Sequence, residues 1–194
     1  MNREIYLLRH GMTAGNRLHQ YIGSTDEPLC PEGAAALAPL AVDGLRQVYV
    51  SPLLRCRETA ALLFPGVPQT PVADLREMDF GVFEAKSYLD MDGDPAYQAW
   101  VDSNCEAPCP GGEDKAGFTE RCCAAFLSVL DAEAGQSDAP LAFVVHGGTI
   151  MSVLSRFGQP AREYYAWHVG NGRGFCLRWN GDAAAPVLEL LREL

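Results

Sequence analysis

The sequence predicts an α/β fold with a largely parallel sheet. Short apolar runs alternate with helical patterns through most of the chain, as strands do when crossover helices join them. Two of these runs, at 4–8 and 141–145, pass directly into a polar motif that holds a histidine. Because ligands of such sheets bind beyond the carboxyl ends of the strands, we expect both motifs at one rim.

The first strand, Glu4–Leu8, is a buried apolar run that ends at Arg9-His10-Gly11. A turn-rich stretch without periodicity follows at 21–29. Pro31-Glu32-Gly33 then leads into an alanine-rich helix that runs to about residue 40, and Pro39 kinks or ends this helix.

The second strand, at 47–50, leads into the start of a helix. Ser51 is in place to cap the helix and Pro52 stands at its first position, an arrangement typical of helix N-termini. The predicted helix runs from 53 to 63 and carries Arg55 in its first turn, so we expect Arg55 near the end of a strand. Another short strand is predicted at 72–75.

The segment 84–112 is the least regular part of the chain. It has acidic residues near its start, an aromatic cluster at Tyr97 and Trp100, and the turn signal Pro110-Gly111-Gly112 at its end. We expect a lid inserted into a single domain that covers residues 1–194. The acidic start of this lid is expected to disfavour polyanionic substrates.

The C-terminal part continues the alternation of helix and strand. Apolar residues recur at helical spacing from 114 to about 134. The apolar strand 141–145 ends in His146-Gly147-Gly148, and a helix is predicted after it from about 150 to 157. Two strands, at 175–179 and 187–191, are predicted to close the fold.

Composition limits the class of partner. The 194 residues carry a formal net charge of −10, which argues against nucleic acid and anionic membranes, because both require a basic face. A few arginines in a cleft can still bind a small phosphate ester. No apolar run is long enough to span a bilayer and no signal-peptide pattern is present, so a cytoplasmic location is expected. The seven cysteines are expected to be reduced, and their spacing does not suit a zinc site.

The tripeptide Arg9-His10-Gly11 suits phosphoryl chemistry. The arginine offers a planar fork of donors to two phosphate oxygens, the histidine can act as nucleophile, base or cation, and the glycine lets a substrate approach the backbone. The alternative is structural, with Arg9 bound to a carbonyl or a carboxylate and His10 an ordinary buried histidine. The tripeptide alone leaves both interpretations open.

Four motifs in a fixed order carry a family resemblance. They are Leu8-Arg9-His10-Gly11-Met12-Thr13 with Asn16, the stretch 51–60 (SPLLRCRETA), Glu77 ahead of Phe80-Gly81, and His146-Gly147-Gly148. With these motifs the chain resembles the histidine phosphatase superfamily, also called phosphoglycerate mutase-like, over nearly its whole length. The resemblance implies a three-layer αβα sandwich and a reaction that needs neither a metal nor another cofactor.

The resemblance also implies roles for particular residues. His10 would be the nucleophile that takes the phosphoryl group, and Glu77 would protonate the leaving oxygen, for which it needs a raised pKa. Without the resemblance, Glu77 would be a surface partner of Arg76. Arg9, Arg55 and His146 would hold the phosphate oxygens during catalysis, and Asn16, Gly23 and Gly147 would complete the substrate-binding site.

Further sequence patterns limit the choice of substrate class. Between the predicted acid and the second histidine the only cations are Lys86, Lys115 and Arg121, a scarcity that favours a monoester phosphatase over a cofactor-dependent phosphoglycerate mutase. The patterns at 21–33, 80–84 and 110–113 resemble those of α-ribazole phosphatases, which act in cobalamin assembly, although Phe83 and Ala85 replace the tryptophan and glycine expected there. A broad-specificity sugar or nucleotide phosphatase is an alternative, as is a phospho-ligand-binding module without turnover.

Other polar and aromatic residues are given structural roles. His19 and His168 are expected to be peripheral, and Tyr164, Tyr165 and Trp167 to be core or interface residues. The expected partners are a small phosphate ester and inorganic phosphate as product. The choice between a monomer and a homodimer is open.

Overall fold

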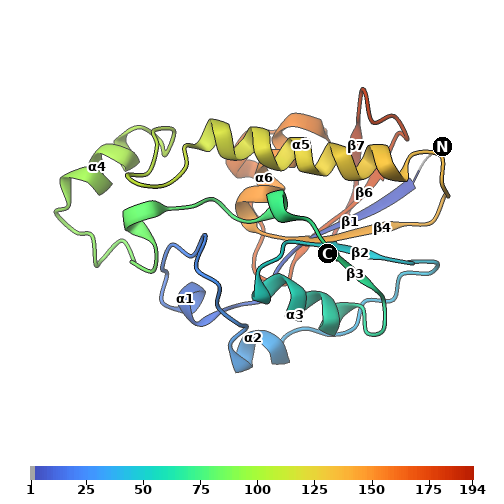
Figure 1. The fold of residues 1–194 in the computed structure, drawn as a ribbon, viewed down its shortest axis with the longest axis horizontal. Helices are drawn as coiled ribbons and strands as arrows, with labels where there is room; N and C mark the ends of the chain where they lie inside the picture. Colours follow the sequence, from blue (N-terminus) through green and yellow to red (C-terminus); the bar gives the residue numbers. More distant parts are fainter. Residues whose placement is uncertain (1–2) are drawn as a thin grey trace.

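The computed structural model describes residues 3–194 and contains a seven-stranded sheet with the order β3-β2-β4-β1-β6-β7-β5 (Figure 1). Strand β6 runs against the other six, which are mutually parallel. The predicted α/β class with a largely parallel sheet is therefore confirmed. The strands are β1 (Arg3–Arg9), β2 (Val48–Val50), β3 (Gln69–Pro71), β4 (Leu141–Val145), β5 (Gly158–Gln159), β6 (Gly174–Trp179) and β7 (Leu188–Glu193).

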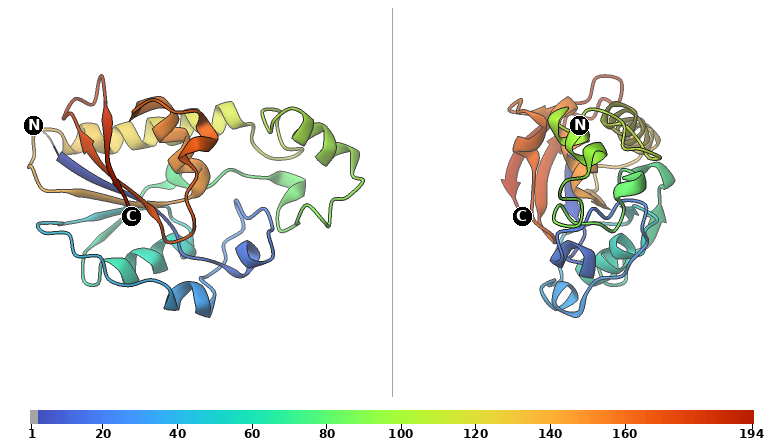
Figure 2. Two further views of the ribbon diagram at one scale, coloured as in Figure 1. Left: turned by 180° about the vertical axis from the view of Figure 1, so that it is seen from behind. Right: turned by 90° about the vertical axis from the view of Figure 1, so that its left-hand side faces the viewer.

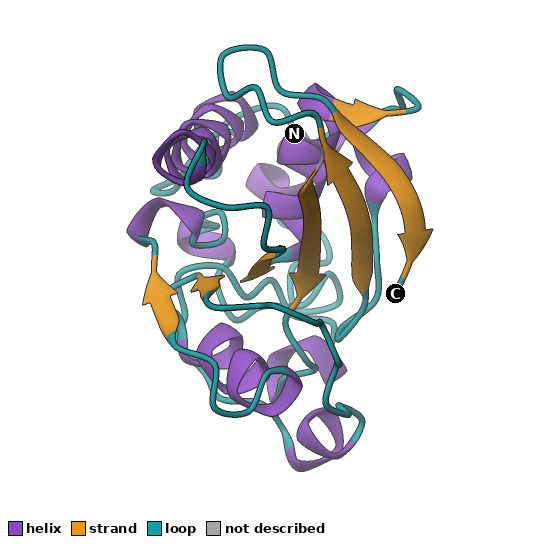
Figure 3. Cartoon of the chain, turned by 90° about the vertical axis from the view of Figure 1, so that its right-hand side faces the viewer, coloured by secondary structure: helices purple, strands orange, loops and turns teal. Residues whose placement is uncertain are grey.

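Helices cover both faces of the sheet, as the strand sequences require. Successive side chains of β1 point to opposite faces, so Ile5 and Leu7 pack in one apolar cluster and Tyr6 and Leu8 in another. Helices α5 and α6 complete the first cluster and α3 the second, so the sheet is the middle of three layers (Figure 3). The helices are α1 (Ala14–Arg17), α2 (Pro31–Ala35), α3 (Leu54–Leu63), α4 (Pro95–Asp102), α5 (Lys115–Glu133) and α6 (Gly147–Phe157).

A third apolar cluster lies outside this sandwich. In it, Phe83, just before the segment 84–112, and Trp100, within that segment, pack with Phe118 and Cys122 of α5. Figures 1 and 2 show α4 and its flanking loops at one end of the molecule, beyond the carboxyl ends of β1 and β4. This segment therefore stands beside the rim at which the two histidine motifs were expected.

Several predicted boundaries were wrong. Helix α2 ends at Ala35 instead of near residue 40, and Leu37 beyond it packs against the α3 face of the sheet. The strand predicted at 72–75 is instead β3 at 69–71 followed by a 3₁₀ turn at Ala73–Leu75. Because β3 is an edge strand that pairs only with β2, it accommodates the polar Gln69 and the proline at 71.

The ends of the helices near the rim also differ from the prediction. Helix α6 begins at Gly147, directly after β4, instead of near residue 150. The N-cap of α3 is Leu53, without a capping side chain, so Ser51 does not have the predicted capping role. The short helices α1 and α4 were not predicted; each begins at a local cap, Thr13 with Asn16 for α1 and Asp94 before Pro95 for α4, and is too short to show a clear apolar periodicity.

Candidate active site

Two neighbouring parallel strands bring the two histidine motifs together. Strands β1 and β4 pair in register up to Arg9 and Val145, and the His10 amide donates to the Val145 carbonyl at 2.9 Å. The rings of His10 and His146 meet edge to face with centroids 5.2 Å apart. Residues 136 positions apart in the sequence thus share one rim because their strands are adjacent.

His10 is held as a neutral ring with a free nitrogen. Its side chain is 3% exposed, and burial, reinforced by the charge of Arg55, lowers its pKa well below the usual value of 6.5. Nδ1 lies 2.7 Å from the Gly11 carbonyl oxygen, which can only accept, so the proton is on Nδ1. The lone pair of Nε2 is then available for attack.

His146 is fully buried and also neutral. Burial lowers its pKa well below 6.5, and the charge of Arg55 adds to the effect. The ring contacts Ser51 of the β2–α3 connection and Cys56 of α3, with Nε2 2.6 Å from Ser51 Oγ and 3.5 Å from Cys56 Sγ. The pair of neutral rings leaves the positive charge of the site to the arginines.

Arg9 and Arg55 supply that charge, and each has an unused donor. Arg9 Nη1 donates to the Val169 carbonyl at 2.8 Å, while Arg55 is fully buried and donates to the carbonyls of Thr25 and Gly23 at 2.7 and 2.8 Å. Within residues 3–194, the Nε atoms of both arginines are buried and have no hydrogen-bond partner. Since buried donors are nearly always satisfied, these two indicate a place for a bound oxyanion.

Glu77 faces the same site from the loop after Leu75. One carboxylate oxygen accepts from the Met78 amide at 3.0 Å and the other from the Gly148 amide at 3.1 Å. Burial raises the pKa of Glu77, and these hydrogen bonds and the nearby arginines only partly oppose the rise. The structure therefore places Glu77 in the shielded setting that a proton donor needs, and not on the surface beside Arg76.

The start of α6 fits closely between these groups. A Cβ at Gly148 would lie 2.4 Å from a Glu77 carboxylate oxygen, and one at Gly147 would contact the Arg9 guanidinium at 3.5 Å. Glycine at 148 is thus required by the close approach of the acid. The His146 side chain does not cap the helix, so the first amides of α6 face the site.

Two further predicted binding residues, Asn16 and Gly23, lie beside the segments that carry His10 and Arg55. The Asn16 side-chain oxygen accepts from the Thr13 amide and from Asn171, and Asn171 also donates to the His10 carbonyl. The Gly23 carbonyl accepts from Arg55, and a Cβ there would lie 1.8 Å from the Met78 carbonyl oxygen. In this structure both residues support the loops that carry His10 and Arg55.

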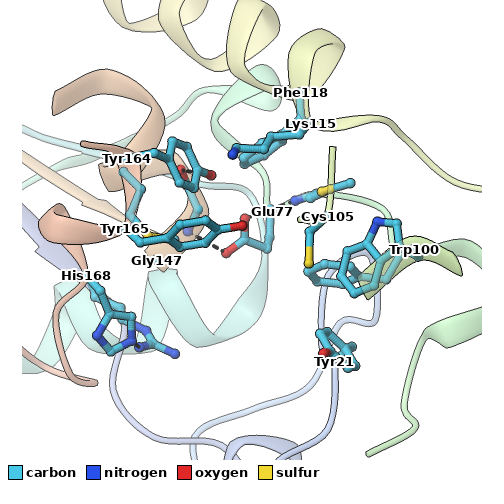
Figure 4. Close-up of a pocket in the computed structure, with 15 residues that line it drawn as sticks. Tyr21, Glu77, Trp100, Cys105, Lys115, Phe118, Gly147, Tyr164, Tyr165 and His168 are labelled. Carbon is cyan, nitrogen blue, oxygen red and sulfur yellow. Dashed lines mark hydrogen bonds between the residues drawn. The ribbon is translucent and has the colours of Figure 1, made fainter. Parts of the chain in front are cut away.

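A cleft of ≈ 350 Å³ opens over the site (Figure 4). Arg9, Glu77 and Gly147 belong to its lining, whereas His10, Arg55 and His146 are buried behind it. The other lining residues are mostly aromatic or apolar; they are Tyr21, Met78, Phe80, Trp100, Cys105, Lys115, Phe118, Gly148, Met151, Tyr164, Tyr165 and His168.

Several lining residues were not predicted to belong to the site. Tyr164 and Tyr165 were expected in the core or an interface, but they wall the cleft, and only Trp167 is fully buried. His168, expected to be peripheral, has Nε2 3.5 Å from Arg9 Nη1. Lys115 places Nζ 4.3 Å from the centre of the Tyr164 ring. No local pattern marks these residues, because they meet only in the folded chain: Tyr164 and Tyr165 lie on the 3₁₀ turn Tyr164–Trp167, which packs against α6, and Lys115 lies on α5.

Two further properties concern ligands and membranes. Within residues 3–194, no group of three or more His, Cys, Asp or Glu side chains is placed to hold a metal ion. None of the helices described is both long enough and apolar enough to cross a bilayer.

Comparison with known proteins finds one matching family model and several similar proteins. The family model described as "Histidine phosphatase superfamily (branch 1)" matches residues 5–191. An adenosylcobalamin/alpha-ribazole phosphatase of Salmonella typhimurium is 31% identical over 177 residues, 87% of this chain and 86% of that protein. A probable phosphoglycerate mutase of Klebsiella pneumoniae is 29% identical over 168 residues, 81% and 76% of the two chains.

The solved structures agree with the sequence comparison. The crystal structure of the alpha-ribazole phosphatase from Shigella flexneri superposes with a TM-score of 0.76 and 26% identity, covering 97% of this chain and 95% of that one. The family match spans both histidine motifs, Arg55 and Glu77. By its fold and by its sequence, the chain belongs to the histidine phosphatase superfamily.

Proposed function

We propose that this phosphatase hydrolyses a small phosphate monoester through a phosphohistidine on His10. The observation that carries the proposal is the pair of buried Nε–H groups of Arg9 and Arg55 without partners, beside a neutral histidine with a free Nε2. Two unused cationic donors next to a nucleophile are what a phosphoryl group requires.

The first step would transfer the phosphoryl group to His10. Nε2 attacks phosphorus, the bond to the leaving oxygen breaks, and the Glu77 carboxyl group gives its proton to that oxygen. Arg9, Arg55 and His146 would stabilise the charge on the phosphoryl oxygens. The Nδ1–H bond to the Gly11 carbonyl keeps the ring oriented throughout.

The second step would hydrolyse the phosphohistidine. Water attacks phosphorus, Glu77, now a carboxylate, takes a proton from the water, and the bond to Nε2 breaks. Inorganic phosphate leaves, and both His10 and Glu77 return to their starting states. The presence of this acid also argues against a module that only binds a phospho-ligand, because binding needs no proton donor.

The leaving group is proposed to be α-ribazole, so that the substrate is α-ribazole 5′-phosphate. Aromatic side chains wall the cleft beyond Arg9 and Glu77, and they suit a leaving group with a flat aromatic ring. Two of the relatives above carry α-ribazole phosphatase in their names. Among residues 3–194, Lys115 and Arg9 are the only Lys or Arg residues in the lining, which disfavours the carboxylate-bearing substrates of a mutase.

The experiment compares kcat/KM for α-ribazole 5′-phosphate, 3-phosphoglycerate and p-nitrophenyl phosphate, with His10→Ala beside the native protein. We expect a marked preference for the ribazole ester, and loss of all three activities in the variant. His19→Asn, a change at an exposed histidine, is the matched control and should leave the rates unchanged.

Each outcome bears on a different part of the proposal. Similar slow rates on all three esters, lost in His10→Ala, would keep the mechanism and favour a broad-specificity phosphatase. Activity that survives in His10→Ala, or no acid-labile phosphoprotein after a quench, would refute the mechanism. A cytoplasmic location and the choice between monomer and homodimer stay predictions from the sequence.

A further inference from the structure

Which nitrogen of His146 carries the proton decides what this ring can do. A neutral imidazole has one donor and one acceptor nitrogen. His146 is fully buried, so its contacts within the protein determine the tautomer. The shortest of these contacts is the 2.6 Å separation between Nε2 and Ser51 Oγ.

The surroundings of Ser51 favour one direction of this hydrogen bond. Ser51 is fully buried, and its oxygen already accepts from the Leu53 amide at 3.4 Å. The nearby Cys56 thiol donates to the Val145 carbonyl at 3.5 Å, and sulfur is a weak acceptor. The imidazole nitrogen is therefore the best acceptor available to the Ser51 hydroxyl proton.

We propose that Ser51 is a positioning residue that donates to His146 Nε2 and so holds the proton on Nδ1. This proposal rests on the proposed function, because the Nδ1–H group is then the donor that His146 offers to a phosphoryl oxygen. Among the described residues, Nδ1 has only the Cys56 sulfur within reach, at 3.8 Å. That contact is weak enough for a phosphate oxygen to replace it.

The two histidines are then set in opposite ways by their neighbours. An acceptor, the Gly11 carbonyl, holds the proton of His10 on Nδ1 and frees Nε2 as the nucleophile. A donor, the Ser51 hydroxyl, occupies Nε2 of His146 and leaves its Nδ1–H for the phosphate. This accounts for a buried serine after β2 that does not cap α3.

Nitrogen NMR on the native protein tests the tautomer without any substrate. With ¹⁵N-labelled histidine, the His146 signals, assigned by their loss in His146→Ala, should show a protonated Nδ1 and an unprotonated Nε2. In Ser51→Ala the signals should move toward a mixture of tautomers. A protonated Nε2 in the native protein would overturn the proposal, and this result does not depend on whether the proposed substrate is turned over.

Kinetics tests the consequence. We expect Ser51→Ala to lower kcat about 10- to 100-fold with KM nearly unchanged, since loss of a whole oxyanion donor costs ~10²–10³. Ser51→Thr, which keeps the hydroxyl, should retain most of the activity. Ser152→Ala, an equally buried serine in α6, is the control for loss of a buried hydroxyl and should stay near the native rate.

A double-mutant cycle separates positioning from general support of the fold. If Ser51 acts through His146, adding Ser51→Ala to His146→Ala should lower kcat by no more than about twofold. An undiminished effect in the double variant, or native kcat in Ser51→Ala, would overturn the proposal. If His10→Ala abolishes activity while Ser51→Ala does not lower it, the proposed function stands and only the role of Ser51 fails.

Discussion

Glu77 illustrates how a single residue acquires its chemistry from its surroundings. The carboxyl group lies against Phe118 and the start of α6, and burial there raises its pKa. His10 is shifted in the other direction, because burial disfavours its cation. The same site can therefore hold the proposed acid in its protonated form and the proposed nucleophile in its neutral form.

At the residue scale, the variant Glu77→Gln tests the role of the acid. We expect kcat/KM for an alkyl phosphate to fall by about 10²–10⁴, the usual contribution of general acid catalysis. The loss should be much smaller for p-nitrophenyl phosphate, because its leaving group departs without a proton. Equal losses on both esters would show that Glu77 does not protonate the leaving oxygen; Glu32→Gln, an exposed carboxylate, is the control.

The pH profile gives a second residue-scale prediction. In the proposed mechanism, activity requires neutral His10, whose pKa is lowered from 6.5, and protonated Glu77, whose pKa is raised from 4.5. The rate should therefore rise with pH as His10 loses its proton, with a midpoint below pH 6.5. It should fall with pH as Glu77 loses its proton, with a midpoint above pH 4.5. In Glu77→Gln the falling limb should disappear; kcat/KM measured from pH 4 to 9 on one ester checks this, and a falling limb that persists in the variant would contradict it.

At the scale of elements, one carboxylate organises the loop that holds Arg55. Glu84 accepts from the amides of Gly23, Ser24 and Thr25, and also from the Thr25 hydroxyl and the Phe80 amide. The carbonyls of this loop in turn accept from Arg55. Glu84 was expected to repel polyanions from a lid, but its carboxylate is turned to this loop and does not line the cleft.

We predict that Glu84→Ala lowers the free energy of unfolding by about 2–4 kcal/mol, since several donors to one charged acceptor lose their partner together. It should also lower kcat/KM, because Arg55 loses its fixed acceptors. Urea unfolding and ester hydrolysis measure the two effects. Asp92→Ala, an exposed carboxylate of the same segment, should change stability by less than about 0.5 kcal/mol, and an equal effect of both variants would refute this role.

At the scale of the whole molecule, burying two histidines at the rim of the sheet makes stability depend on pH. Burial lowers the pKa of both His10 and His146 below 6.5. The unfolded chain then binds more protons below that pH than the folded protein does. The free energy of unfolding should therefore fall as the pH drops below about 6.5.

The prediction is sharpest in Glu77→Gln, because the raised pKa of Glu77 has the opposite sign and stabilises the fold at lower pH. In that background, urea unfolding between pH 7 and pH 5 should give a free energy of unfolding whose slope against pH corresponds to up to two protons taken up on unfolding. Adding either His10→Ala or His146→Ala should lower this slope by about one proton. A slope that both changes leave intact would show that other groups cause it.

Local sequence patterns were enough to predict the fold class and the meeting of the two histidine motifs. Strand β4 and the stretch 5–8 of β1 are apolar, and a histidine follows each strand directly, so the rule for parallel sheets was enough to place His10 and His146 together. The predicted acid, Glu77, also reaches this rim. These predictions were possible because the strand patterns and the motifs after them depend on residues that are close in the sequence.

The hydrogen-bond partners of the buried polar side chains could not be predicted from the sequence, because they depend on the tertiary structure. Ser51 matched a helix cap locally, but its partner is His146, 95 positions away. Glu84 was assigned to the acidic start of a lid, but its carboxylate binds a loop 59–61 positions away. Likewise, Tyr164 and Tyr165 line the cleft from the 3₁₀ turn that packs against α6, and His168 follows this turn. A buried polar group takes the best partner that the whole packing brings within reach, and that choice is made when the layers close, not by the residues next to it in the sequence.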